Sequence, residues 1–421
     1  MTKTIALVHP SFVPPFLFEA AAKNDVALVA ILPPGTEITT RYPAVIAYEY
    51  LPLYDDPEAA LAAMPALHER WKFDGIISPK EYSIIFAAQA AKKLGLRGLA
   101  PEITKNARSK AVMRELFRES GLVTPQFMTI AGAHEVELCR AMPFPCVVKP
   151  SSGANSDGVQ RVENWDELVR ACTQIDDLNK SMYDGFSQLD GKRFSGIIVE
   201  QYIEGREFAV ELFAHEGEVH ALNCGYKGHP TGPYFEETVY LSPPMLPEEK
   251  IREIQAVAVA GMRALKLDNG PGHCELRLDG QGRPVIIEIA ARMGGAGCAQ
   301  VNVEQANGID YAGLWFASAT GGMTPALWPP RPDGSGRAGT SWIVPMNGSG
   351  VLKSVEGLDK VRAHPDCYRV LLCGEIGKTY RPLPYFDGFP ALIFGAHDSP
   401  AAGQAFFDFL EQNVTVVWGE A

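Results

Sequence analysis

The sequence predicts a mixed α/β and α+β fold. It has an open α/β region first, antiparallel strands with long helices in the middle, and a small, mostly β region at the end. Over about the first hundred residues, short β-branched runs alternate with helical segments, which is typical of a parallel sheet. In the middle, apolar runs return across Gly-rich turns, which indicates antiparallel pairing. The Pro/Gly-rich residues 323–337 then have the composition of a linker.

Length and composition indicate a globular protein of several domains. At 421 residues the chain is too long for one core, so we expect two to four domains or subdomains. Apolar residues make up 46% and charged residues 21%, which is ordinary for such proteins. The net charge of −12 argues against nucleic acid and membrane surfaces as partners, but it allows local basic pockets for an anionic substrate.

The cysteines and the N-terminus suggest a cytoplasmic protein. Eight cysteines are scattered without a Cys-x-x-Cys pair, so we expect reduced, mostly buried thiols. The first residues read as a strand rather than a signal peptide, and no apolar run is long enough for a membrane span. We therefore expect a cytoplasmic location.

The elements of the first region follow from their local patterns. We expect strands at 3–10, 25–34, 42–53 and 73–79, and helices at 16–24, 57–71 and 83–96. No Gly-x-Gly-x-x-Gly follows the first strand, so a dinucleotide site is not expected there. We expect this region to help shape a substrate pocket.

The rest of the chain has longer patterns. A helix is expected over 104–121, with Thr104 as its cap and Gly121 at its end. Two or three antiparallel strands are expected over 195–222, and the last ninety or so residues should form a β unit with one late helix. The other expected elements are a strand at 144–150, a loop at 151–158, a strand at 159–162, a hairpin at 272–291, and helices at 248–267, 303–321 and 400–413.

Two glutamates in the hairpin are the strongest chemical signal. If the turn centres between Gln281 and Gly282, Glu275 faces Glu288 on one side of the ribbon, with Arg277 and Ile286 two residues away. Like charges at ~5 Å need a cation between them, and oxygen ligands alone suit Mg²⁺ or Mn²⁺. The alternative is a solvated edge hairpin, and a slip of one residue would separate the pair.

Upstream, "VVKPSSGANSDGVQRV" places Lys149 before a loop of small residues. Backbone N–H groups in such a loop can surround phosphate oxygens, although Ser/Gly loops are also common as plain turns. The competing "CGEIGKT" at 373–379 has two residues between its glycines where a P-loop needs four, so we interpret it as a turn.

A third segment, "IIVEQYIEGREF", ends an apolar strand with Glu200 and carries Glu207 across a turn at Gly205. A carboxylate with neighbouring backbone amides can read a purine edge, and a second carboxylate can accept from ribose hydroxyls. A polar hairpin between two strands is the alternative interpretation.

Together, in this order, these segments resemble the ATP-grasp superfamily of carboxylate–amine ligases, over about residues 105–297. The resemblance implies an ATP-grasp fold with domains at 1–103, 104–325 and 326–421. Within the central part it implies a nucleotide lid at about 143–205 and a metal and catalytic part at 206–325. It also implies ATP and Mg²⁺ or Mn²⁺ as cofactors, and a homodimer as the default assembly.

The resemblance implies a role for each matching residue. Lys110 and Lys149 match the lysines on the nucleotide, and Glu275 and Glu288 match the metal carboxylates. The lid, adenine and ribose positions are matched by Ser156, Gly158, Glu200, Gln201, Tyr202, Ile203 and Glu207.

The second metal glutamate is followed two residues later by Ala290, where many members have Asn; water or phosphate would have to replace that ligand. The "E-x-A-A-R" arrangement is instead similar to L-amino-acid ligases that make dipeptides, of the bacilysin type, and "GPGHCEL" and "RMGG" are similar to carnosine-synthase-like members. The resemblance implies that Arg292, with the amides of Gly294 and Gly295, receives the substrate carboxylate or its acyl phosphate. A surface arginine is the alternative.

Three further residues are weaker candidates. Glu237 and Tyr240 are expected on the acceptor side, or else in a solvated loop. His273 could hydrogen-bond a developing oxyanion or only satisfy the core. His220, Cys224 and His229 lack the spacing of a zinc site.

The expected reaction joins a small-molecule carboxylate to an amine through an acyl phosphate, with release of ADP and phosphate. The resemblance implies that both substrates are amino acids. Two alternatives stay open: an ATP-grasp enzyme with another acceptor, of the carboxylase or purine-pathway type, and an ATP-binding protein without turnover.

Overall fold

The N-terminal region is a parallel sheet with helices on both faces, as the sequence predicts. The computed structural model describes residues 2–154, 156–179, 196–381 and 387–420. The sheet has the order β3-β2-β1-β4, and every neighbouring pair is parallel. Its elements are β1 (Lys3–Val8), α1 (Phe16–Lys23), β2 (Val26–Leu32), β3 (Val45–Tyr50), α2 (Pro57–Trp71), β4 (Gly75–Ile77), η1 (Glu81–Ser83) and α3 (Ile84–Leu94).

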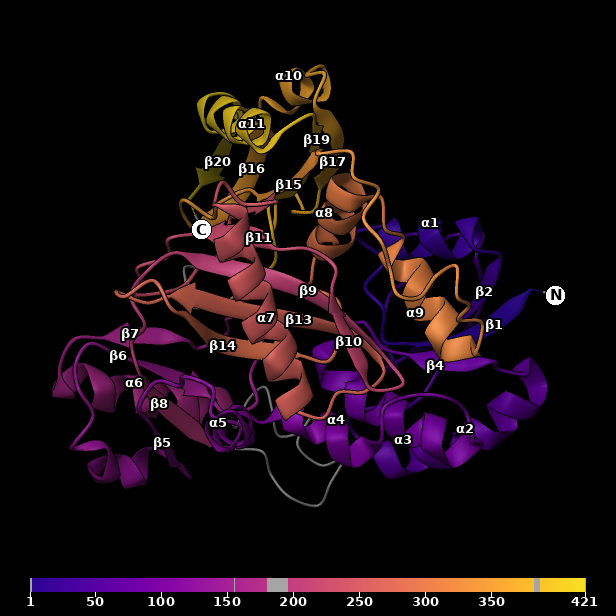
Figure 1. The fold of residues 1–421 in the computed structure, drawn as a ribbon, viewed down its shortest axis with the longest axis horizontal. Coiled ribbons are helices and arrows are strands. Elements are labelled where there is room, and N and C mark those ends of the chain that lie inside the picture. The colour runs from indigo at the N-terminus through magenta and orange to yellow at the C-terminus, as the bar shows by residue number, and fades with distance from the viewer. Residues whose placement is uncertain (1, 155, 180–195, 382–386, 421) are drawn as a thin grey trace.

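The two faces of this sheet pack against different helices because alternate side chains of a strand point to opposite sides. Ala6 and Val8 pack with α2 and α3. Ile5 and Leu7 pack with α1 and with α9 (Tyr311–Thr320), a helix from much later in the chain. Figure 1 shows α9 beside α1 and β1. The N-terminal sheet is therefore fixed to the central part of the molecule.

The single helix expected over 104–121 is two helices, α4 (Pro101–Arg108) and α5 (Lys110–Glu119). Ser109 breaks the run with an extended backbone and caps α5, since its side chain accepts from the amide of Val112. Thr104 lies inside α4, where its hydroxyl donates to the carbonyl of Ala100, so its expected role as a cap is wrong. The break places Lys110 at the first position of α5.

Residues 127–201 contain a small antiparallel sheet of order β5-β8-β6-β7, covered by α6. The expected strand, loop and returning strand around Lys149 are present, since β6 pairs antiparallel with β7. The elements are β5 (Phe127–Ile130), η2 (Ala133–Cys139), β6 (Cys146–Pro150), β7 (Gln160–Val162), α6 (Trp165–Leu178) and β8 (Ile197–Gln201). Residues 197–221 do form three strands, but β8 belongs to this sheet and the next two to another.

The large sheet forms the centre of the molecule. Its order is β14-β13-β9-β11-β12-β15-β19-β17, with β10 paired to β9. Figure 1 shows α7 lying across the β9, β13 and β14 end of this sheet. Up to the hairpin its elements are β9 (Glu207–His215), β10 (Glu218–Ala221), β11 (Gly225–Gly228), β12 (Val239–Ser242), α7 (Glu248–Ala264), β13 (Gly270–Leu278) and β14 (Pro284–Ala290).

The hairpin pairs Glu275 with Glu288, as predicted, but by a different route. Its turn spans residues 279–283, so it centres on Gln281 rather than between Gln281 and Gly282. Near the turn Arg277 therefore faces Val285, and the expected pairing with Ile286 is wrong. A register shift after Glu275 leaves Ile287 as an extra residue, and this bulge restores the Glu275–Glu288 pair.

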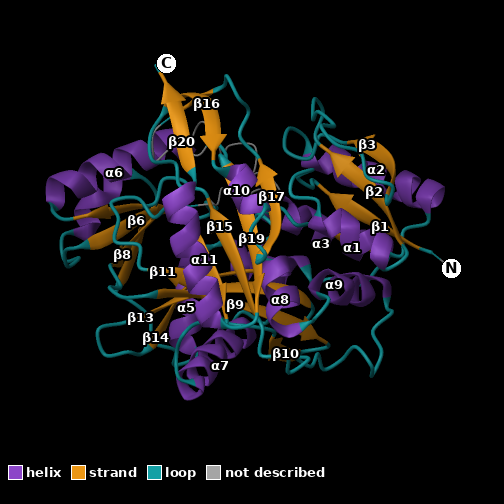
Figure 2. Ribbon diagram, turned by 90° about the horizontal axis from the view of Figure 1, so that it is seen from above, coloured by secondary structure: helices purple, strands orange, loops and turns teal. Residues whose placement is uncertain are grey.

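The C-terminal region is continuous with the large sheet rather than a separate β unit. Strand β15 pairs with β12 on one side and with β19 on the other. A three-stranded sheet, β18-β16-β20, lies beyond it (Figure 2). The elements are β15 (Ala338–Ile343), β16 (Gly350–Glu356), α10 (Leu358–Arg362), β17 (Cys367–Leu372), β18 (Thr379–Tyr380), β19 (Ala391–His397), α11 (Pro400–Asn413) and β20 (Thr415–Gly419).

Two helix expectations change in this half of the chain. The single helix expected at 303–321 is replaced by α8 (Cys298–Asn307) and α9, separated at Gly308, which adopts the left-handed conformation that ends α8. The C-terminal region has α10 in addition to the one expected helix. None of the helices in the described residues is long and apolar enough to cross a bilayer.

Candidate active site

One cavity of about 540 Å³ lies where all these parts meet. The N-terminal region contributes residues 11, 13, 14 and 79–82, the small antiparallel sheet contributes β6 and its loop, and the large sheet contributes the floor. Almost all the residues predicted from the sequence line it. The exceptions are Gly158 and Gly294, which do not reach the lining.

Alternation along β9 and β13 separates an apolar face from a charged one. Val210, Leu212, Cys274 and Leu276 pack with α5 and α7 in one core. The intervening residues face the other way, so β13 presents His273, Glu275 and Arg277 to the cavity.

The register between β13 and β9 pairs these charges across the strands. His273 faces Glu211, and its Nδ1 donates to Oε1 of Glu211 at 2.6 Å. Arg277 faces Glu207, and its Nε donates to Oε2 of Glu207 at 2.9 Å. Glu275 faces the small Ala209, which leaves room for a cation from the next strand.

That cation is Lys227 of β11, which the sequence analysis missed. Its ammonium lies 2.6 Å from Glu275, 3.0 Å from Glu237 and 3.1 Å from Glu207, and its side chain is 1% exposed. Burial alone would lower the pKa of Lys227, but these carboxylates raise it well above its ordinary value. Lys227 therefore stays charged and ties three carboxylates together.

The two paired glutamates face the same cavity, and each has a cationic partner. Glu288 accepts from Lys110 at 3.0 Å, and Lys110 also donates to the carbonyl of Gly153 in the loop after β6 at 2.9 Å. Burial would raise the pKa of Glu275, but Lys227 and His273 hold it well below its ordinary value. Glu275 is therefore negative at neutral pH, as a cation site requires.

Lys149, Glu200 and Arg114 form a buried triad beside the cavity. Lys149 lies 2.6 Å from Glu200, which also accepts from Nε of Arg114. Arg114 donates in addition to the carbonyl of Ile287, the bulge residue, at 2.7 Å. Burial would raise the pKa of Glu200, but Arg114 and Lys149 lower it to about 2. In this arrangement the Glu200 carboxylate is bound to two cations, while the backbone of Gln201 to Ile203 remains on the lining.

The other end of the cavity carries the aromatic residues Tyr202 and Phe235, whose rings stack with centroids 6.3 Å apart. Arg277 lies over both rings and donates to the carbonyl of Ile203 at 2.9 Å. This flat, partly apolar end suits a planar ring, and Glu207 lies next to it through its bond with Arg277.

Arg292 lies on the turn after β14 and is held by the N-terminal region. Its Nε donates to Glu81 at 2.6 Å, and its side chain is 13% exposed and lines the cavity. Glu81 also accepts from Arg108 at 2.9 Å. The alternative of a surface arginine is wrong, because Arg292 is part of a buried, bridging cluster.

The glycines of this turn differ. The amide of Gly294 donates to Glu211 at 3.3 Å, and a side chain at this position would collide with His273. Gly295 lines the cavity, and a Cβ there would meet open space. Of the two glycines, Gly295 is therefore the one with room beside it for a ligand.

His273 is buried between two carboxylates. Its Nδ1 donates to Glu211, and its Nε2 lies 3.2 Å from Glu275. Burial would lower the pKa of His273, but Glu211 and Glu275 raise it to about 10. The ring is therefore a cation at neutral pH that supports Glu275, and both of its nitrogens are engaged within the protein.

The remaining predicted residues lie on the lining with defined partners. Tyr240 donates to Glu237, and Glu237 accepts from Lys227, so the alternative of a solvated loop is wrong for both. Ser156 lines the cavity with a left-handed backbone, φ 57°. Gly158 is also left-handed, and a Cβ there would lie 2.7 Å from Leu178, so it shapes the loop from behind.

The sequence carries weak signals for three lining residues that the sequence analysis missed: Arg114, Glu81 and Lys227. Arg114 lies one helical turn after Lys110, so the two share a face of α5. Glu81 follows β4, and the carboxyl ends of parallel strands are where α/β sheets place their sites. Lys227 stands ten residues before Glu237, which the sequence analysis expected on the acceptor side.

In the part of the chain that the structure describes, no three His, Cys, Asp or Glu side chains converge as a metal-ligand group. Among the described residues, therefore, no third side chain of these types joins Glu275 and Glu288 in such a group.

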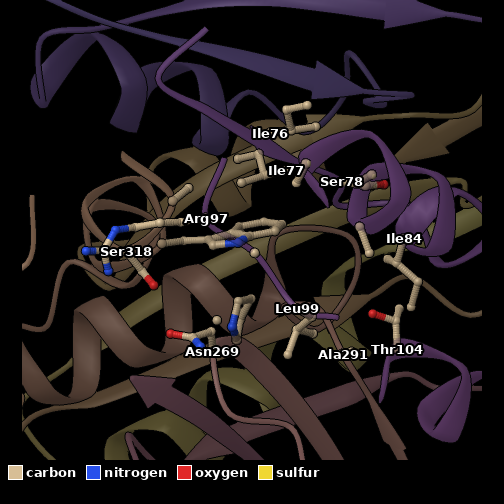
Figure 3. Close-up of a pocket in the computed structure, with 18 residues that line it drawn as sticks. Ile76, Ile77, Ser78, Ile84, Arg97, Leu99, Thr104, Asn269, Ala291 and Ser318 are labelled. Carbon is tan, nitrogen blue, oxygen red and sulfur yellow. The ribbon is translucent and has the colours of Figure 1, made fainter. Parts of the chain in front are cut away.

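A second, smaller cavity of about 70 Å³ lies between the N-terminal region and the large sheet. Most residues on its lining are apolar, and Figure 3 shows Arg97 and Ser318 on one side and Thr104 and Ile84 on the other. No carboxylate lines it, so it lacks the groups that ligase chemistry needs.

Comparison with known proteins supports the resemblance. The ATP-grasp N-terminal domain matches residues 18–98, and the ATP-grasp domain matches residues 142–300. The crystal structure of an L-amino acid ligase from Bacillus licheniformis superposes with a TM-score of 0.91 and 32% identity, over 99% of each chain. Phosphoribosylglycinamide synthetase from Anaerococcus prevotii shares the fold, with a TM-score of 0.71 and 18% identity, over 99% of this chain and all of that one.

Two relatives are similar over shorter stretches. Alanine–anticapsin ligase of Bacillus subtilis (strain 168) is 24% identical over 72% of this chain and 71% of its own. D-alanine–D-alanine ligase of Bordetella pertussis is 25% identical over 63% of this chain and 82% of its own.

The fold and the cavity thus define an ATP-grasp protein. Within that class, the chain belongs to the L-amino acid ligase family. It is therefore an ATP-dependent ligase that forms carbon–nitrogen bonds.

Proposed function

We propose that this enzyme activates the carboxylate of one amino acid as an acyl phosphate and joins it to the amine of a second, with release of ADP and phosphate. The observation that carries the proposal is the in-register pair Glu275–Glu288, which faces one cavity together with Lys110, Lys149 and Arg292. Several cations and a carboxylate pair around one site suit a reaction in which negative charge gathers on a transferring phosphoryl group.

The cavity offers a place for each part of the nucleotide. The stacked Tyr202 and Phe235 fit the adenine ring, with backbone groups of Gln201 to Ile203 at its edge and Glu207 near the ribose. Lys149, Lys110 and the loop that contains Ser156 fit the phosphates. We assign Glu200 to the positioning of Lys149, since its carboxylate is bound to Lys149 and Arg114.

Glu275 and Glu288 fit Mg²⁺ or Mn²⁺, because hard cations prefer carboxylate oxygens and take their other ligands from water and phosphate. A bound metal would neutralise charge on the transferring phosphoryl group. Ala290 supplies no third ligand where an Asn could, in keeping with a pair of protein donors.

The reaction has two steps in our proposal. A carboxylate oxygen of the donor attacks the γ-phosphorus, and the bond to the β-phosphate oxygen breaks to leave ADP. The neutral amine of the acceptor then attacks the acyl carbon, phosphate leaves, and the amine loses a proton to solvent. Arg292 and the Gly295 amide hold the donor carboxylate and the oxygen that becomes negative in the second step.

The test replaces one carboxylate of the pair. We expect Glu288→Gln to reduce amino-acid-dependent ADP formation by at least about a thousandfold, since it removes a group that acts on the transferring phosphate. The variant should still fold, as circular dichroism checks, although its unfolding free energy should fall because the buried Lys110 loses its carboxylate partner. Glu249→Gln, the same change on the exposed start of α7, is the control. Near-normal turnover of Glu288→Gln with magnesium would contradict the metal assignment, and dependence on bicarbonate rather than a second amino acid would favour another acceptor.

The proposal includes three further expectations, which concern the domain division, the assembly and the location. The division at residues 103 and 325 is our working division, and limited proteolysis tests it. We propose a homodimer, which light scattering tests. We also place the enzyme in the cytoplasm, in keeping with the free thiols of its eight cysteines.

A further inference from the structure

One wall of the large cavity is apolar and comes from the C-terminal half of the large sheet. Within it, β15 pairs with β19 so that Ile343 lies opposite Leu392. The side chains of this wall belong to or pack against one hydrophobic cluster: Tyr240, Ala296, Ile343, Cys373, Phe389 and Leu392. Such a wall fits an aliphatic or aromatic side chain and offers nothing to a phosphate.

The apolar wall begins directly after the turn that follows β14 and carries Arg292. Ala296 belongs to the wall and follows Gly295 directly in the chain. The next residue, Gly297, lies against the start of α1, since a Cβ there would be 2.4 Å from Phe16. A carboxylate held at Arg292 and Gly295 would therefore have its side chain beside this wall.

Glu236 lies next to the wall and lines the same cavity. The amide of Ile343 donates to the carbonyl of Thr238 at 2.8 Å, and the amide of Met346 donates to Oε1 of Glu236 at 2.7 Å. These two bonds fix the segment of Glu236 against the end of β15.

Glu236 differs from the other carboxylates on the described lining. Each of them has a cation beside it: Glu81, Glu200, Glu207, Glu237, Glu275, Glu288 and Asp387 through ion pairs, and Asp157 through the charge of Lys80. The interactions of Glu236 are burial and the amide of Met346, and burial raises its pKa. A half-buried carboxylate in this position is suited to a cation that arrives with the ligand.

We infer that Glu236 binds the α-ammonium of the amino acid whose carboxylate is activated, while the apolar wall receives its side chain. The inference rests on the proposed function and names the donor as a neutral, apolar α-amino acid. The donor keeps its ammonium through both steps, so a carboxylate partner costs the reaction nothing. The acceptor amine must be neutral to attack, and a carboxylate would stabilise its protonated form instead.

The test compares leucine with 4-methylpentanoate, which has the same side chain and carboxylate but no amine. Wild type and Glu236→Gln are assayed with each donor and saturating glycine, and leucyl-glycine and 4-methylpentanoyl-glycine are quantified by mass spectrometry. Gln keeps an oxygen for the amide of Met346, so the fold should be retained. Glu249→Gln is the matched control.

We expect wild type to prefer leucine by at least about a hundredfold in kcat/KM, and Glu236→Gln to reduce that preference by about 10- to 100-fold through a higher KM for leucine. The KM for ATP should not change. An unchanged preference, or an equal loss for both donors, would overturn the inference.

A binding measurement separates this inference from the ligase proposal. Leucine added without ATP should raise the melting temperature of wild type and of Glu249→Gln, but not that of Glu236→Gln. If this pattern holds while no amino-acid pair gives ADP, the proposed reaction is wrong and the ammonium site stands. If leucine stabilises Glu236→Gln as well as wild type, the ammonium site is wrong whatever the turnover.

Discussion

Lysine and arginine side chains that are almost fully buried hold most of the carboxylates around the cavity. The side chains of Arg114 and Lys227 are each 1% exposed. Arg114 contacts the Glu200 carboxylate and the distant carbonyl of Ile287. Lys227 contacts carboxylates from more than one element. A buried charge is stable only while its partner is charged as well. Removing one of these carboxylates should therefore lower the free energy of unfolding, because a neighbouring cation stays buried without its counter-charge.

Glu200 gives the sharpest stability prediction. We expect Glu200→Gln to lower the free energy of unfolding by about 3–5 kcal/mol, because Arg114 and Lys149 would remain buried without their common counter-charge. Glu137→Gln removes an exposed ion pair with Arg140 and should leave the free energy of unfolding near that of wild type. Urea denaturation measures both, and equal small losses would contradict the buried triad.

The same residue predicts an acid dependence. Its pKa falls from 4.5 to about 2 in the folded protein, so its stabilisation is present above pH 4.5 and is lost as pH falls through 2. The unfolding free energies of wild type and Glu200→Gln should therefore converge between these values. A constant difference across that range would show that Glu200 keeps an ordinary pKa.

His273 predicts the opposite dependence. Its pKa rises from 6.5 to about 10, so its contribution is complete below pH 6.5 and is lost as pH rises through 10. The stability advantage of wild type over His273→Gln should decline across this interval. An NMR titration of the ring checks the cause directly, and a midpoint near 6.5 would rule out the charged pair with Glu211.

At the scale of elements, irregular backbone decides which side chains meet. The bulge at Ile287 restores the Glu275–Glu288 pair and turns a carbonyl toward Arg114. Lys227 likewise stands at a register shift between β11 and β9. Gly205, between β8 and β9, has φ 131° and lies so close to the chain that a Cβ would be 1.9 Å from the carbonyl oxygen of Leu278.

This close approach yields a prediction for the link between the two sheets. We expect Gly205→Ala to lower the unfolding free energy by more than about 3 kcal/mol, from backbone strain and the clash together. Gly282→Ala also has a left-handed backbone, φ 74°, but open space around it, so strain alone should cost about 1 kcal/mol. Chemical denaturation of both variants separates the two effects, and equal losses would show that the contact with Leu278 can relax.

The sequence predicted the elements whose signal is local. Alternation placed Glu275 and Glu288 on one face of a hairpin, although they face each other only because of the bulge at Ile287, and the parallel N-terminal sheet followed from its βαβ order. The pairing of β13 with β9, which brings His273 to Glu211 and Arg277 to Glu207, joins residues more than sixty positions apart and has no local signal. The bulge and the break at Ser109 were missed for the related reason that small backbone deviations leave the apolar pattern intact.

At the scale of the whole molecule, the cavity is closed by regions far apart in the sequence. The N-terminal region provides Glu81, the helix pair α4 and α5 provides Arg108 and Lys110, and the hairpin provides Arg292. The sequence predicted that the first region shapes a pocket, but not which of its residues would do so. Because Glu81 contacts both arginines, the N-terminal region takes part in positioning the group assigned to the substrate carboxylate.

A double-mutant cycle between Glu81→Gln and Arg292→Met measures this coupling. We expect an interaction energy above about 1.5 kcal/mol in kcat/KM for the donor, because both side chains are buried and Arg292 is oriented by Glu81 at 2.6 Å. The control cycle uses Glu19 and Arg369, an exposed pair that also joins the N-terminal region to a distant strand, at 3.1 Å. That pair should give less than about 1 kcal/mol, because solvent screens it. If both cycles give equally small values, Glu81 does not orient Arg292, and the N-terminal region contributes only shape to the site.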